Sequence, residues 1–106
     1  MNYTIRIELT AAKNFSYTNG YLRVQRGDGI RFTCNVAFKI KFLHGSPFEK
    51  TEFSRESDGG VPRDEDEFIS VEGDAKRQTY HYLVVAIGPD DGLPYVDGGC
   101  PTIEVL

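Results

Sequence analysis

A strict alternation of apolar and polar side chains from residue 30 to residue 42 most constrains the fold of this chain. A period of two indicates a half-buried β-strand and not a helix. The segment is longer than the usual strand of about 5–6 residues. It is therefore either one bent strand that crosses a sandwich corner or two strands joined near Asn35. The apolar positions are Ile30, Phe32, Cys34, Val36, Phe38, Ile40 and Phe42, and Ala37 is the small exception on the polar face.

Shorter segments repeat the alternation along the rest of the chain. Residues 3–9, 21–24, 68–71 and 103–105 each predict a short half-buried strand. Residues 78–87 form the most hydrophobic segment, and both of their faces are apolar after Tyr82. A strand that is apolar on both faces is expected to be central in its sheet and covered on both sides.

Turn-forming residues separate these strands. Asn19-Gly20 is a strong turn signal that ends a turn-rich stretch from residue 14. Residues 43–66 are the least regular part, with Phe48 and Phe53 as expected anchors, and residues 88–94 predict a further loop. Seven or eight short strands with turns between them predict an all-β fold, a β-sandwich that forms a single domain over residues 1–106.

Size and composition fit one small globular domain. The chain has 106 residues, of which 40% are hydrophobic, so it can bury one core without metal or disulfide staples. No run reaches the roughly 18–20 apolar residues of a membrane span, and Met1 is not followed by a secretory signal. We therefore expect a cytoplasmic protein with no membrane partner, or a secreted one if Met1 replaces a removed signal.

Charge is divided unevenly between the two halves of the sequence. Residues 1–50 hold eight basic and three acidic residues, a net +5, whereas residues 51–106 hold four basic and thirteen acidic residues, a net −9. The two halves either compensate each other within the sandwich or form two opposite faces that meet a partner or another copy. The candidate interaction surface consists of Arg31, Lys39 and Lys41, as a basic stripe, and of Asp64, Glu65, Asp66 and Glu67, as an acidic run.

No motif for catalysis, for metal binding or for nucleic-acid binding stands out. Neither His44 nor His81 lies near a recognisable nucleophile motif, and the acidic residues do not follow the spacing of a calcium loop. An acidic chain is also a poor match for phosphate backbones, so no nucleic-acid partner is expected. Cys34 and Cys100 are expected to be free thiols in a reducing compartment and a disulfide only in an oxidising one.

Four pieces of the sequence resemble cupredoxin-like Greek-key sandwiches, and an immunoglobulin-like sandwich is the alternative. The pieces are residues 24–32, 47–49, 80–84 and 97–105. Blue-copper sites need two imidazoles and a thiolate, often with a thioether. Here Met1 is the only methionine, and no histidine follows Cys100. The resemblance therefore implies a copper-free relative with no cofactor and no metal site.

Together these observations favour a protein-interaction or self-assembly module that is not an enzyme. Its partner would be another protein or another copy of itself, for which an exposed strand edge offers one mode of contact. The alternative is a small soluble inhibitor or accessory protein, for example one encoded by a phage or a mobile element. A metal-binding electron-transfer protein is a second alternative, which the missing copper ligands disfavour.

Overall fold

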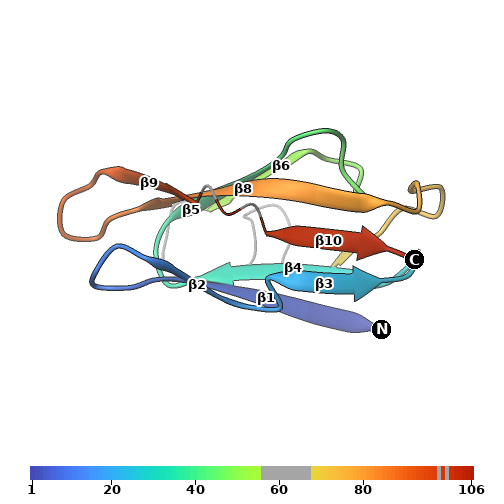
Figure 1. Cartoon of the computed structure of the whole chain (residues 1–106), viewed down its shortest axis with the longest axis horizontal. Helices are drawn as coiled ribbons and strands as arrows, with labels where there is room; N and C mark the ends of the chain where they lie inside the picture. The colour runs from blue at the N-terminus through green and yellow to red at the C-terminus, as the bar shows by residue number, and fades with distance from the viewer. Residues whose placement is uncertain (56–67, 98, 100) are drawn as a thin grey trace.

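Two mixed β-sheets form the two layers of the structure, which is a computed structural model that describes residues 1–55, 68–97, 99 and 101–106 (Figure 1). The first sheet has the order β2-β1-β4-β7, with β1 at Asn2–Leu9, β2 at Phe15–Thr18, β4 at Gly29–Cys34 and β7 at Ile69–Ser70. The second sheet has the order β3-β10-β8-β5-β6, and β9 also pairs with β8. Its strands are β3 at Tyr21–Val24, β5 at Phe38–Phe42, β6 at Glu52–Arg55, β8 at Thr79–Ile87, β9 at Pro94–Asp97 and β10 at Thr102–Val105.

This all-β architecture, with no helix among the described residues, is consistent with a β-sandwich. Two of its strand pairs are parallel: β1 with β4, where Ile5 lies opposite Phe32, and β10 with β3, where Ile103 lies opposite Leu22. The other pairs are antiparallel. No helix in this part of the chain is long and apolar enough to cross a membrane.

The core lies between the two sheets, where the alternation of each strand directs its apolar side chains. Eight of these side chains are 0% exposed: Ile5, Ile30, Phe32, Ile40, Tyr82, Val84, Ala86 and Ile103. An aromatic cluster fills one part of the core, with ring centroids 5.2–6.5 Å apart and several edge-to-face contacts. Its members are Phe32, Phe42, Phe48, Phe53 and Tyr82, so the expectation that Phe48 and Phe53 anchor the irregular region is confirmed.

The long alternating segment consists of two strands, β4 and β5, which belong to different sheets. The chain leaves the first sheet at Asn35. Its side-chain amide accepts a hydrogen bond from the Leu9 N–H at 2.9 Å and donates one to the Leu9 carbonyl at 3.1 Å. The side chain thus continues the pairing of β1 after the main chain has turned away, and the alternation persists because Val36 stays buried during the crossing.

Three strands lie where the sequence predicted turns or loops. β2 falls within the turn-rich stretch, β6 falls within the least regular region, and β9 begins at Pro94, the last residue of the predicted loop 88–94. Each lies among turn-forming residues, and β2 and β9 have no fully buried side chain, unlike the equally short β3 and β10. The prediction that β8 is covered on both faces is also wrong: Leu83 and Val85 are only half-buried, and Ile87 is 36% exposed.

One buried hydroxyl in the core has no partner. Burial raises the pKa of the Tyr82 phenol, and its Oη forms no hydrogen bond with the residues that the structure describes. The Tyr80 hydroxyl, in contrast, donates to the Lys76 carbonyl at 2.8 Å. These two tyrosines of β8 form a matched pair for measuring the cost of an unpaired hydroxyl.

We expect Tyr82→Phe to raise the free energy of unfolding by about 1 kcal/mol, because it removes a hydroxyl that is buried without a hydrogen-bond partner among the described residues. The same change at Tyr80 should lower it by about 1 kcal/mol, because a hydrogen bond is lost. Urea denaturation of the two variants measures both effects. A loss of stability in both would show that the Tyr82 hydroxyl is hydrogen-bonded in solution.

Candidate functional site

The three described residues of the predicted interaction surface do not gather in one place. Arg31 lies on the outer face of β4 in the first sheet, whereas Lys39 and Lys41 lie on the outer face of β5 in the second. A single basic stripe of these three residues is therefore not formed. The acidic run at Asp64, Glu65, Asp66 and Glu67 lies outside the described residues.

An exposed apolar stripe runs over the outer face of β8 and β9. We define it as Leu83, Val85, Ile87, Pro94 and Val96. The pairing of the two strands places Val96 opposite Val85 and Pro94 opposite Ile87. Val96 is 57% exposed, and both members of the second pair also face solvent. These side chains form a continuous surface near the edge of the second sheet.

The stripe has a charged border on its β5 side. Lys41 lies opposite Leu83, and Lys39 lies opposite Val85. Both lysines are ion-paired with Glu52 of β6, with N–O distances of 3.7 Å for Lys41 and 3.6 Å for Lys39. All three groups are about half exposed, so these pairs contribute little to stability. They border the apolar stripe with polar groups on this side, and an apolar centre with a polar rim is the pattern of a protein interface.

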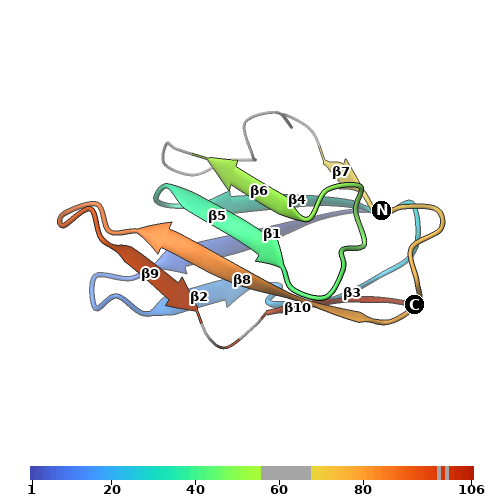
Figure 2. The same cartoon turned by 90° about the horizontal axis from the view of Figure 1, so that it is seen from above.

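The β8–β9 hairpin that carries the stripe is fixed to the β1–β2 hairpin of the other sheet, and the two lie at the same end of the molecule (Figure 2). The Lys13 ammonium donates to Asp90 Oδ1 at 2.7 Å and lies 5.6 Å from the centroid of the Tyr95 ring. The Tyr17 hydroxyl donates to the Asp97 carboxylate. Burial, together with this hydrogen bond, raises the pKa of Tyr17. These contacts hold the stripe in a defined orientation before any partner binds.

Two aspartates beyond Ile87 add negative charge at the hairpin turn. The hydrogen bond from Lys13 lowers the pKa of Asp90, and the hydrogen bond from the Tyr95 hydroxyl lowers the pKa of Asp91. Both carboxylates are therefore ionised at neutral pH. The stripe thus has basic residues along its β5 side and acidic residues past its β8 end.

The described histidine and cysteine side chains, His44, His81 and Cys34, do not form a recognisable reactive cluster. His44 is exposed after β5, and His81 is exposed on β8. No group of three or more His, Cys, Asp or Glu side chains able to hold a metal occurs in the part of the chain that the structure describes. Cys34 is buried, as expected, with its Sγ 3.7 Å from Asn35 Oδ1. Cys100 lies outside the described residues, so its relation to Cys34 stays a prediction.

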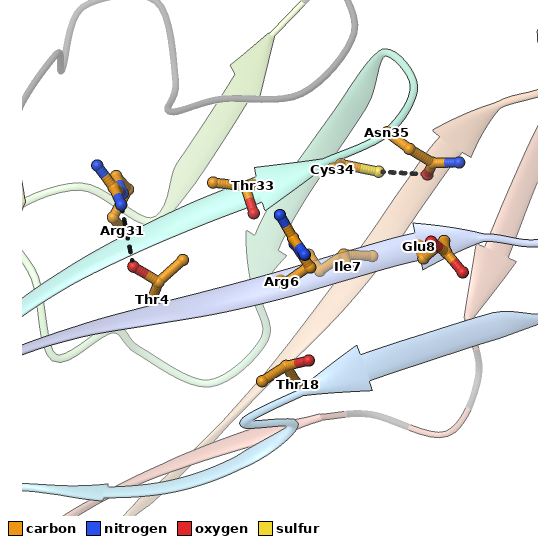
Figure 3. A pocket seen from close by; sticks show the side chains of 9 residues that line it. All are labelled: Thr4, Arg6, Ile7, Glu8, Thr18, Arg31, Thr33, Cys34 and Asn35. Carbon is orange, nitrogen blue, oxygen red and sulfur yellow. Dashed lines mark hydrogen bonds between the residues drawn. The ribbon is translucent and has the colours of Figure 1, made fainter.

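The opposite outer face, on the first sheet, carries a polar pocket of about 660 Å³ (Figure 3). Its lining includes Arg31 of the predicted surface together with Arg6 and Thr33, which the sequence did not single out. The signal for this pocket was the polar face of two strands, 3–9 and 30–34, but their pairing could not be read from the alternation. The stripe was missed for another reason, because its β8 members read as core residues.

Comparison with known proteins gives no relative: no family model, no curated protein and no solved structure matches this chain. Function must therefore be inferred from the surfaces themselves.

Proposed function

We propose that this chain is a non-catalytic interaction module that self-associates through the apolar stripe. The observation that carries the proposal is a row of five neighbouring apolar side chains on the outer face of β8 and β9, of which Ile87, Pro94 and Val96 are exposed and Leu83 and Val85 are half-buried. Isolated exposed apolar residues are normal, but a contiguous patch with a polar border marks an interaction surface. The anchored hairpin supports the proposal, because an ordered patch loses little entropy on binding.

The face of the sheet is a better contact surface than the open edge of β9. The Gly88 N–H donates to the Leu93 carbonyl at 2.9 Å, so this carbonyl faces β8. The nitrogen of Pro94 belongs to the same peptide group and points to the opposite side, toward the open edge. Proline has no N–H, so this edge lacks a donor that an added strand would need. The edge is thereby protected against strand addition, while the apolar face stays accessible.

Charge around the stripe favours a second copy as the partner. Lys39 and Lys41 on its β5 side share one carboxylate, Glu52, and so keep a net positive charge. Asp90 and Asp91 beyond its β8 end have one ammonium, Lys13, between them and keep a net negative charge. In a two-fold arrangement with antiparallel strands, the acidic turn of each copy moves toward the lysine side of the other. Such an interface is self-complementary, as a symmetric dimer requires.

The cupredoxin-like variety of Greek-key sandwich is likewise a proposal. The parallel pairs β1–β4 and β3–β10 support this proposal. A second support is that three of the resembling pieces of sequence fall on the strands β4, β8 and β10. We propose a copper-free member of this kind, since His44 and His81 are both exposed and belong to no metal-binding group of described residues.

Self-association predicts a dimer that a single stripe substitution weakens. We expect sedimentation equilibrium to give a dimer for the wild-type chain, and Val96→Lys to weaken dimerisation at least about tenfold, as loss of a central apolar contact does. Val96 is 57% exposed in the single chain, so the variant should fold normally.

Leu106→Lys is the matched control, because Leu106 is a 45% exposed apolar residue outside the stripe. It should dimerise like the wild type. A wild-type chain that stays monomeric at the highest soluble concentration would contradict self-association and favour the inhibitor or accessory alternative. Equal weakening by both substitutions would contradict the stripe as the interface.

A further inference from the structure

The polar pocket of the first sheet lies on the opposite side of the molecule from the stripe and needs a separate explanation. Neighbouring strands β1, β2 and β4 direct polar side chains to this outer face, as Figure 3 shows. The six that matter here are Thr4, Arg6, Glu8, Thr18, Arg31 and Thr33. The parallel register of β1 and β4 places Thr4 opposite Arg31 and Arg6 opposite Thr33. Two guanidinium groups and hydroxyl groups therefore alternate across adjacent strands.

Two donors in this pocket are buried without an acceptor. The Nε of Arg31 and the Oγ1 of Thr33 are inaccessible to solvent and form no hydrogen bond with the described residues. A buried polar atom without a partner destabilises the folded chain and is uncommon in folded proteins. Both atoms belong to outward-facing residues of β4 two positions apart, so they lie on the same side of the sheet.

The Arg31 guanidinium is held in place while its Nε stays unpaired. One terminal nitrogen donates to Thr4 Oγ1 at 3.3 Å, and the guanidinium carbon lies 4.7 Å from the centroid of the Phe68 ring. These contacts fix the plane of the group. A fixed guanidinium with a free N–H is suited to an oxyanion, whose oxygen atoms accept hydrogen bonds in that plane.

The positive charge of the pocket exceeds its negative charge. Arg23, Lys39 and Lys41 are ion-paired, whereas neither Arg6 nor Arg31 forms an ion pair with a residue that the structure describes. Glu8 is the one acidic side chain of the lining, so two positive charges face one negative charge. The pocket therefore has excess positive charge and unused donors.

We infer that this pocket binds the oxyanion group of a small ligand, a carboxylate or a phosphate. Both atoms are covered in the unliganded chain, so neighbouring side chains would move aside to let the anion accept hydrogen bonds from Arg31 Nε and Thr33 Oγ1. Arg6 would add positive charge from the neighbouring strand. This function goes beyond self-association, because it uses the other sheet. Both occupants share the same chemistry, and separate titrations with acetate and inorganic phosphate distinguish them.

The test is a titration of ¹⁵N-labelled protein with each anion at constant ionic strength, followed by NMR at the arginine Nε–H signals. We expect a saturable shift of the Arg31 signal with at least one anion, and the anion that binds more tightly identifies the ligand class. No saturable shift of this signal with either anion would overturn the inference. The same titration of Val96→Lys should give the same result, so a failure of the proposed dimer leaves this test intact.

Variants separate a binding role from a structural one. Thr33→Val keeps the shape of the side chain and should weaken binding about tenfold, as expected for one lost hydrogen bond to a charged group. Its urea midpoint should not fall, because the hydroxyl forms no hydrogen bond with the residues described in the unliganded chain. A fall in the midpoint would assign the hydroxyl to the fold and contradict its role in the site.

Arg6→Gln tests the contribution of charge in the pocket, and Arg77→Gln is its matched control. Both remove one exposed arginine, but Arg77 lies outside the pocket, between β7 and β8. Arg6→Gln should weaken anion binding, whereas Arg77→Gln should leave it unchanged. Equal effects of the two substitutions would show a general charge effect and overturn the assignment to this pocket.

Discussion

Val84→Asp is expected to leave the chain unfolded in the absence of denaturant. Val84 is 0% exposed and lies at the centre of β8, between β5 and β9. An unpaired carboxylate at this position costs several kcal/mol, or must take up a proton to stay buried. A domain of this size has a total stability of only about 5–15 kcal/mol. Far-UV circular dichroism and chemical denaturation measure the outcome.

Glu104→Ala is the control at a solvent-facing position of the same sheet. Glu104 accepts a hydrogen bond from the Tyr21 hydroxyl at 2.7 Å and lies 3.3 Å from Arg23 Nε. Its side chain is 28% exposed, so these contacts are screened and their loss should cost at most about 1 kcal/mol. If Val84→Asp denatured at the same urea concentration as the wild type, β8 would not lie in the core.

Phe32→Ala should lower the free energy of unfolding by about 3–5 kcal/mol, the usual cost of removing a large core side chain and leaving a cavity. The Phe32 ring is 0% exposed and meets Tyr82 edge-on at 5.6 Å, Phe48 at 6.3 Å and Phe53 at 6.0 Å. Phe32 belongs to the first sheet, whereas Phe53 and Tyr82 belong to the second. The cavity should therefore weaken the packing of both sheets at once.

Phe15→Ala tests whether the effect comes from core position and not from the loss of any phenyl ring. Phe15 is only partly buried on the edge strand β2 and stacks on Tyr17 at 6.4 Å. We expect a loss well below that of Phe32→Ala when both are measured by urea denaturation. Equal losses would contradict the central place of Phe32 in the aromatic cluster.

The core could be predicted from the sequence because alternation reports directly which side chains face inward. Ile5, Phe32, Ile40 and Val84 are all fully buried, and each lies on the apolar face of a predicted strand. For residues 30–42 the sequence left two alternatives, one bent strand or two strands joined near Asn35. Both preserve the same period, and the two hydrogen bonds between Asn35 and Leu9 that mark the crossing join residues 26 positions apart.

The two candidate surfaces could not be predicted, for different physical reasons. Val85 and Ile87 have the composition of core residues, and only the absence of a covering layer over them makes them a surface. The pocket depends on the parallel pairing that brings Arg6 beside Thr33, and pairing between distant strands leaves no local signature. The strand β9, which carries Val96, has no fully buried side chain, and its sequence lacks the apolar alternation that predicted the equally short β3 and β10.

The parallel strand pairs also determine when folding can finish. β10 lies between β3 and β8, so the second sheet stays divided until residues 102–105 are available. The pairing of β1 with β4 also forms late, because two parallel strands cannot be joined by a hairpin and β4 must first be synthesised. Chains dominated by such distant contacts fold in milliseconds to seconds, slowly for their size. During synthesis on the ribosome, the emerging chain therefore carries an open core, which only the arrival of β10 can close.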